Sequence, residues 1–233
     1  MSTAPSYSES VLQFACEGES MLGIVSLPAN NPVPQAGVII VVGGPQYRVG
    51  SHRQFVLLAR ALASAGMAVL RFDCRGMGDS GGAQRSFTAL DADIRAAVDA
   101  LHSRLPSLES LSLWGLCDGA SAALLYQGRS SDARVKRLCL ANPWVRSEAT
   151  LARTQIKHYY TARLRQPEFW KKLLSGKVAL KALRDIVGNL RAVRASGGKA
   201  GGGASKTFQQ AMGEGWQRFP GPILLMLSAE DYV

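Results

Sequence analysis

The sequence has little cysteine and no long apolar run. Four cysteines in 233 residues are too few for a disulfide framework, and no two of them form the C-x-x-C pattern of a zinc site. We therefore expect reduced thiols, no bound metal and no cofactor. The longest apolar run covers residues 36–42, whereas a membrane-spanning helix needs about 20 residues. The cysteines are Cys16, Cys74, Cys117 and Cys139.

The first ten residues also lack the features of a secretory signal. They include Glu9 and several serines but neither a basic stretch nor an apolar segment, which predicts a cytoplasmic protein. The chain is 47% hydrophobic and 19% charged, so disorder is not expected. Its length is sufficient for one large α/β domain.

Positive charge is concentrated in one part of the chain, which has a formal net charge of +10. Residues 144–218 contain 15 Lys and Arg against four acidic residues, and the remainder is close to neutral. The basic stretches lack the interleaved aromatic residues that stack on bases, so we expect no nucleic-acid partner. Such a charge favours a small anionic substrate; a merely solvated basic surface is the alternative.

Before residue 144, short apolar segments alternate with amphipathic segments of helical period. Residues 37–42 are apolar throughout, which is typical of a strand buried on both faces. Alternation at this spacing predicts right-handed crossovers and a mainly parallel sheet. The predicted strands are 11–15, 21–27, 37–42, 67–72, 110–114, 135–141 and 222–227, and the predicted helices are 52–65, 89–105 and 118–126.

After residue 143 the sequence changes to basic helical stretches. Five glycines within residues 196–205 predict a linker, and the apolar run 222–227 restores the strand pattern. The sequence thus predicts a core of residues 1–143 and 216–233, interrupted by a basic helical segment at 144–215.

The strongest chemical motif is the sequence GLCDG at residues 115–119, between a predicted strand and a predicted helix. This is the G-x-nucleophile-x-G pattern of a nucleophile elbow, whose glycines leave room for a strained turn. The turn would present the Cys117 thiol beside a helix N-terminus, which favours a thiolate. The N–H of Asp118 would be one oxyanion-hole donor. A structural thiol in an ordinary turn is the alternative.

Three segments resemble the α/β-hydrolase superfamily. Residues 73–80 (DCRGMGDS) match its D-x-R-G-x-G-x-S loop, in which Asp73 and Arg75 are expected to brace the loop. Together with GVIIVVGGPQYRVGSHRQF at 37–55 and WGLCDGA at 114–120, they resemble the type 1 hydrolases associated with the bacterial exosortase A system. The resemblance implies an eight-stranded, mostly parallel sheet with flanking helices and a helical cap after the sixth strand.

The resemblance also implies a nucleophile–acid–histidine triad in that order along the chain. Cys117 matches the nucleophile, where most relatives carry serine, and Asp231 matches the acid, with Glu230 in reserve. A solvated turn acid is the alternative for Asp231. The oxyanion loop matches residues 43–46, where Pro45 has no N–H to donate, so the second donor is the N–H of Gly44 or of Gln46.

None of the three histidines stands where the triad needs one. His52 begins the first predicted helix near the mouth of the site and is a candidate substrate contact, while His102 lies in the second helix and His158 in the basic segment. The triad histidine is expected after Asp231, so we expect the chain to be part of a longer hydrolase. Its seventh strand would then expose an apolar edge.

These observations predict a hydrolase that cleaves an ester or thioester through a thioacyl-enzyme on Cys117. An acyltransferase that uses the same intermediate remains open. So does a binding protein that keeps the fold without turnover, which the missing histidine favours.

Overall fold

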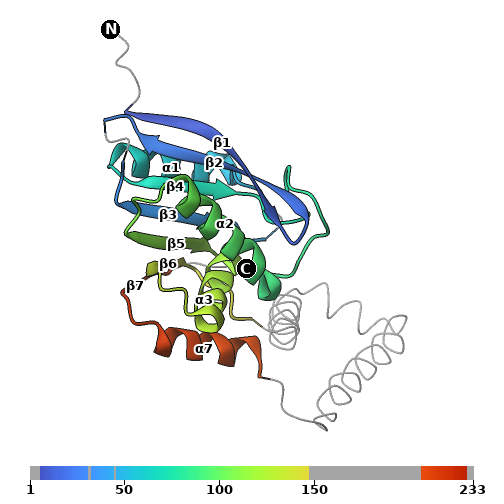
Figure 1. The fold of residues 1–233 in the computed structure, drawn as a ribbon. Coiled ribbons are helices and arrows are strands. Elements are labelled where there is room, and N and C mark those ends of the chain that lie inside the picture. Colours follow the sequence, from blue (N-terminus) through green and yellow to red (C-terminus); the bar gives the residue numbers. More distant parts are fainter. Residues whose placement is uncertain (1–5, 31–32, 45, 147–205, 230–233) are drawn as a thin grey trace, which may run out of the picture. The chain divides into compact units, whose positions relative to one another are not determined.

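Seven strands form one sheet in the order β1-β2-β4-β3-β5-β6-β7 (Figure 1). The computed structural model describes residues 6–30, 33–44, 46–146 and 206–229. The strands are β1 Tyr7–Cys16, β2 Glu19–Pro28, β3 Ala36–Val41, β4 Ala68–Phe72, β5 Ser110–Leu116, β6 Val135–Ala141 and β7 Ile223–Met226. The helices are η1 Ser51–Arg53, α1 Gln54–Ser64, η2 Phe87–Ala89, α2 Asp91–Arg104, α3 Asp118–Ser130 and α7 Phe208–Arg218.

The sheet is antiparallel at one end and parallel elsewhere. β1 and β2 form an antiparallel hairpin, and β2 pairs antiparallel with β4. β4, β3, β5, β6 and β7 are parallel neighbours. The predicted fold class is confirmed. Because the strands are parallel, the loops that follow β3, β4 and β5 meet at one edge, where ligands bind in open α/β sheets.

Helices cover both faces of the sheet, as the alternating side chains of β3 show. Val38 and Ile40 pack in a cluster with Phe55 of α1. Ile39 and Val41 belong to the larger cluster on the other face, to which α2, α3 and α7 contribute. A strand with apolar side chains on both faces is the signature of a central parallel strand, which explains the continuous apolar run in the sequence.

Close contacts divide the chain into two compact units, residues 1–145 with 207–233, and residues 146–206. α7 belongs to the first unit and packs against α3; a Cβ atom added to Gly128 would lie 2.8 Å from Gly215 Cα. The core therefore resumes at residue 207 rather than at the expected 216. The predicted linker at 196–205 lies outside the described residues.

β7 lies at one end of the sheet order and is largely exposed. Leu224 is 55% exposed and Leu225 is 41% exposed, and Leu227 just beyond the strand is 70% exposed. The predicted apolar edge is thus present in the described part of the chain. Among the described helices, none has the length and apolar character needed to cross a membrane.

Candidate active site

Cys117 occupies a strained turn between β5 and α3. Its backbone has φ 56° and ψ −124°, a positive φ that non-glycine residues rarely adopt and that costs of order 1–3 kcal/mol. Its N–H donates to the Ala141 carbonyl at 2.8 Å, and its carbonyl accepts from Ala120 at 3.1 Å and from Trp144 at 3.1 Å. These bonds to β6 and to the segment after it hold the strained conformation in place.

The two glycines of the elbow are required by close backbone packing. A Cβ atom on Gly115 would lie 2.5 Å from Ala120 N, and one on Gly119 would collide with the carbonyl oxygen of Val41. Both positions face main chain, which cannot move aside as the end of a flexible side chain would. The predicted elbow is therefore present in both conformation and packing.

The loop after β3 packs against the first turn of α3. A Cβ atom on Gly43 would collide with Asp118 Oδ1 and lie 2.7 Å from the Leu116 carbonyl oxygen. Gly44 follows with φ +64° and also faces the Asp118 carboxylate. Two predicted oxyanion-hole residues, Gly44 and Asp118, thus come together. The Gln46 side chain accepts a hydrogen bond from Gln54 Nε2 at 3.4 Å.

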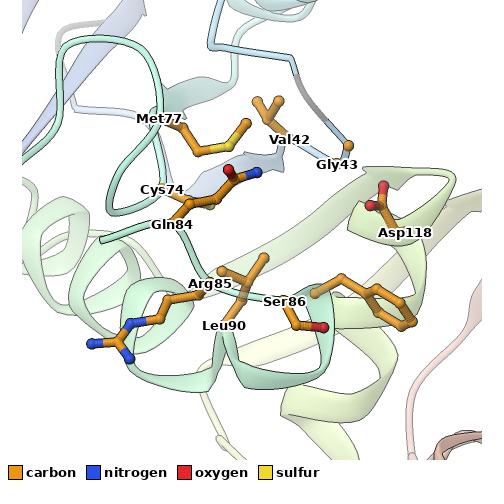
Figure 2. A pocket seen from close by; sticks show the side chains of 11 residues that line it. Val42, Gly43, Cys74, Met77, Gln84, Arg85, Ser86, Leu90 and Asp118 are labelled. Carbon is orange, nitrogen blue, oxygen red and sulfur yellow. The ribbon is translucent and has the colours of Figure 1, made fainter. Parts of the chain in front are cut away.

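A cavity of about 280 Å³ opens between this loop, the loop after β4 and the elbow (Figure 2). Most of its wall is apolar, but the Asp118 carboxylate faces Gly43 across one end. Asp118 Oδ1 is buried and has no hydrogen-bond partner among the described residues. The lining residues are Val42, Gly43, Gly44, Cys74, Met77, Gln84, Arg85, Ser86, Phe87, Leu90 and Asp118.

The family model described as "Serine aminopeptidase, S33" matches residues 33–196, more than half of the chain and including the elbow. The chain belongs to this α/β-hydrolase family. No curated protein matches the sequence.

Two solved structures have a similar fold. Est1E from Butyrivibrio proteoclasticus, solved with ferulic acid bound, is 25% identical with a TM-score of 0.51, over 57% of this chain and 52% of that one. The Pyrococcus furiosus esterase Pf2001 is 21% identical with a TM-score of 0.56, over 72% of this chain and 61% of that one. The chain thus spans between about half and three fifths of the length of these two proteins.

Arg48 ties the loop after β3 to the loop after β4. Its N–H donates to Asp73 Oδ1 at 2.7 Å, and its guanidinium pairs with Asp73 and, at 2.5 Å, with Asp79. Asp73 is fully buried, and the N–H of Asp79 also donates to it at 3.0 Å. Burial alone would lower the pKa of Arg48, but the bonds to Asp79 and Asp73 outweigh it and raise that pKa.

A second ion pair holds the loop after β4 against α2. The Arg75 guanidinium donates to Asp93 Oδ2 at 2.8 Å through Nη2, and its N–H donates to Asp93 Oδ1 at 2.8 Å. Both side chains are buried, and Glu17 pairs with Arg75 from outside. Asp73 and Arg75 thus brace this loop, as predicted.

The four cysteines differ in burial, and Cys117 is half-buried. Burial raises the pKa of Cys16, of Cys74 and of Cys139, and nearby carboxylates add to the effect at Cys16 and Cys74. Cys16 and Cys74 are buried and Cys139 is half-buried. Across the described ranges, no three His, Cys, Asp or Glu side chains are grouped as a metal site would need.

Of the predicted site residues that the structure describes, Gly44 and Asp118 line the cavity, whereas Cys117, Gln46 and His52 do not. His52 lies in η1 with an exposed side chain, and neither it nor His102 of α2 lines the cavity. Asp231, Glu230 and His158 lie outside the described residues, so their roles stay predictions. The ion pairs of Arg48 with Asp73 and Asp79 were not predicted from the sequence, because a single arginine in a loop forms no local pattern.

Proposed function

We propose that this protein hydrolyses an ester or thioester through nucleophilic attack by Cys117. The observation that carries the proposal is the strained backbone of Cys117 at the start of α3, packed against the Gly43–Gly44 loop. Such a turn has a steric cost and is typical of the nucleophile in this fold. The ferulic acid in the Est1E structure and the esterase name of Pf2001 support an ester substrate.

In the proposed reaction, Cys117 Sγ attacks the substrate carbonyl carbon. The negative charge that develops on the carbonyl oxygen is stabilised by the N–H of Asp118 and by a second N–H, that of Gly44 or Gln46. The tetrahedral intermediate collapses, the C–O or C–S bond breaks, and the alcohol or thiol leaves with a proton. Activated water then cleaves the thioacyl-enzyme and regenerates the Cys117 thiol.

On the resemblance, the proposed triad places its acid at Asp231 and takes a histidine as its base. Neither His52 nor His102 lines the cavity beside the elbow, so we assign the base to neither of them. On the resemblance of residues 37–55, 73–80 and 114–120, we further associate the enzyme with a bacterial exosortase or exopolysaccharide system. The basic charge of residues 144–218 favours an anionic substrate.

Kinetics with p-nitrophenyl esters and acyl thioesters test the proposal on the full-length protein. We expect turnover that Cys117→Ala abolishes and that Cys139→Ala, which removes a thiol from β6, leaves in place. Turnover that survives Cys117→Ala would refute the cysteine nucleophile. Binding of these compounds with no turnover by the wild type would instead favour a non-catalytic binding protein, and transfer of the acyl group to an added alcohol rather than to water would favour an acyltransferase.

A further inference from the structure

The Asp118 carboxylate lies where a negative charge opposes the proposed reaction. It immediately follows Cys117, and its Oδ1 faces the Gly43–Gly44 loop, where negative charge develops on the substrate oxygen. At distances of a few ångströms, two like charges in a site of intermediate polarity repel each other strongly. The residue whose N–H would stabilise the oxyanion therefore carries a side chain that destabilises it.

Asp118 lies in the first turn of α3, whose N-terminus favours a negative charge, but its Oδ1 is buried and receives no hydrogen bond from the residues that the structure describes. A buried acceptor without a partner is costly. Arg85 lines the same cavity, but its guanidinium points away from Asp118 (Figure 2). Asp93 makes the contrast clear: it also lies in the first turn of a helix, yet Arg75 satisfies both of its oxygens.

The cavity provides the space for a ligand group that would fill this need. Around Asp118 its wall consists largely of apolar side chains, among them Val42, Met77, Phe87 and Leu90. A volume of about 280 Å³ is at the small end for ligand sites. An acyl chain of a few atoms could contact the apolar wall and place a polar end at Asp118.

We propose that Asp118 makes this site selective for short acyl groups that carry a hydrogen-bond donor, a hydroxyl or an ammonium group, which meets Oδ1. The inference rests on the proposed function of Cys117. The donor satisfies the buried oxygen and offsets the charge beside the oxyanion, so it strengthens acylation as well as binding. An acyl group that itself ends in a carboxylate is rejected, because it would place a second negative charge against Asp118; the negative charge of an anionic substrate would therefore lie on its leaving group.

Four thioesters of N-acetylcysteamine test this selectivity: butyryl, 3-hydroxypropionyl, 3-aminopropionyl and succinyl. A hydrogen bond to a buried charged group corresponds to a factor of roughly 10 to 100, so we expect kcat/KM for the donor-bearing substrates to exceed that for butyryl by this factor, with succinyl slowest. If only 3-aminopropionyl is preferred over butyryl, the natural ligand group is an ammonium. If 3-hydroxypropionyl and 3-aminopropionyl are preferred over butyryl equally, a neutral donor is sufficient. Equal rates for butyryl and both donor-bearing substrates in the wild type would overturn the proposal.

Asp118→Asn keeps the backbone N–H and removes only the charge. We expect it to abolish the preference for donor-bearing acyl groups and to relieve the rejection of succinyl. Glu109→Gln removes an exposed carboxylate elsewhere and serves as the matched control, which should retain the wild-type order. A preference that survives Asp118→Asn would show that another group provides it and would overturn the assignment.

Alkylation of Cys117 separates this proposal from the proposed function, because it needs no turnover. Iodoacetate is anionic and iodoacetamide is neutral, so the Asp118 charge should slow only the reaction of Cys117 with iodoacetate. Asp118→Asn should therefore raise the ratio of the iodoacetate rate to the iodoacetamide rate by several-fold, whereas Glu109→Gln should not. Absence of any acylation of Cys117 together with a raised ratio would contradict the proposed function and support the charge effect of Asp118. A ratio that Asp118→Asn leaves unchanged would contradict the role of Asp118 even in an active enzyme.

Discussion

Replacement of Arg48 by methionine should destabilise the protein and slow acylation together. Methionine keeps the length of the side chain but leaves the buried Asp73 carboxylate without its ion-pair partner. It also releases the loop that contains Gly44 from the loop after β4. The predicted effect therefore combines a loss of folding free energy with a less ordered oxyanion hole.

The structure sets the size of the loss. Removing one member of a buried ion pair costs about 3–5 kcal/mol. Here Arg48 is 15% exposed and Asp73 is fully buried, and Asp73 keeps the N–H donors of Arg48 and Asp79. We therefore expect about 3 kcal/mol, at the lower end of that range. Asp79→Asn should cost at most about 1 kcal/mol, because Asp79 is 64% exposed.

Urea unfolding of the single and double variants measures these energies. Arg48→Met combined with Asp73→Asn should recover part of the loss, since the double variant leaves no unpaired charge, and the cycle should give a coupling of about 2 kcal/mol. Acylation of Cys117 should slow in Arg48→Met and partly recover in Arg48→Lys. If Arg48→Met and Asp79→Asn lower the free energy of unfolding by the same small amount, the ion pair between Arg48 and Asp73 does not stabilise the fold as argued.

Three further predictions concern the elbow, the acid stability and the thiols. Gly115→Ala should lower the free energy of unfolding by about 1–3 kcal/mol through overpacking. Gly213→Ala in α7, where an added Cβ meets nothing within 4 Å, should raise it by about 0.5–1 kcal/mol. Equal effects of the two variants in urea unfolding would contradict the steric argument. Burial would raise the pKa of Asp132, but bonds from Arg134 and Tyr126 lower it to about 2. The free energy of unfolding should therefore fall by about 2 kcal/mol as the pH falls from 4 toward 2. Asp132→Asn should remove this pH dependence. Iodoacetamide with peptide mass mapping should label Cys117 well before Cys16, Cys74 and Cys139, whose pKa values are raised by burial; faster labelling of any of these three would count against an activated Cys117.

The elements that sequence reasoning found are those with a local pattern. The GLCDG motif predicted the elbow because its glycines mark positions where only main chain fits, and the packing of Gly115 and Gly119 confirms that reason. The apolar run at 37–42 predicted a buried central strand, which β3 is. In both cases, the physical requirement (close main-chain packing at the elbow, burial on both faces for β3) acts on residues that are near one another in the sequence.

The features that the sequence did not disclose depend on contacts between distant segments. α7 was not assigned to the core, because its apolar face becomes meaningful only against α3. The pairing of Arg48 with Asp73 and Asp79 joins two loops that follow different strands. The Oδ1 of Asp118 has no hydrogen-bond partner among the described residues because of the way the Gly43–Gly44 loop packs over it. Such features need the folded chain.

Trapping of the acyl-enzyme shows which side chain is the nucleophile. The full-length protein is mixed with p-nitrophenyl acetate, quenched in acid within seconds, and digested for mass mapping. We expect an acetyl group on the peptide that contains Cys117, absent from Cys117→Ala and retained in Cys139→Ala. Stoichiometric acetylation at another residue, with Cys117 unmodified while p-nitrophenol is released, would contradict this expectation.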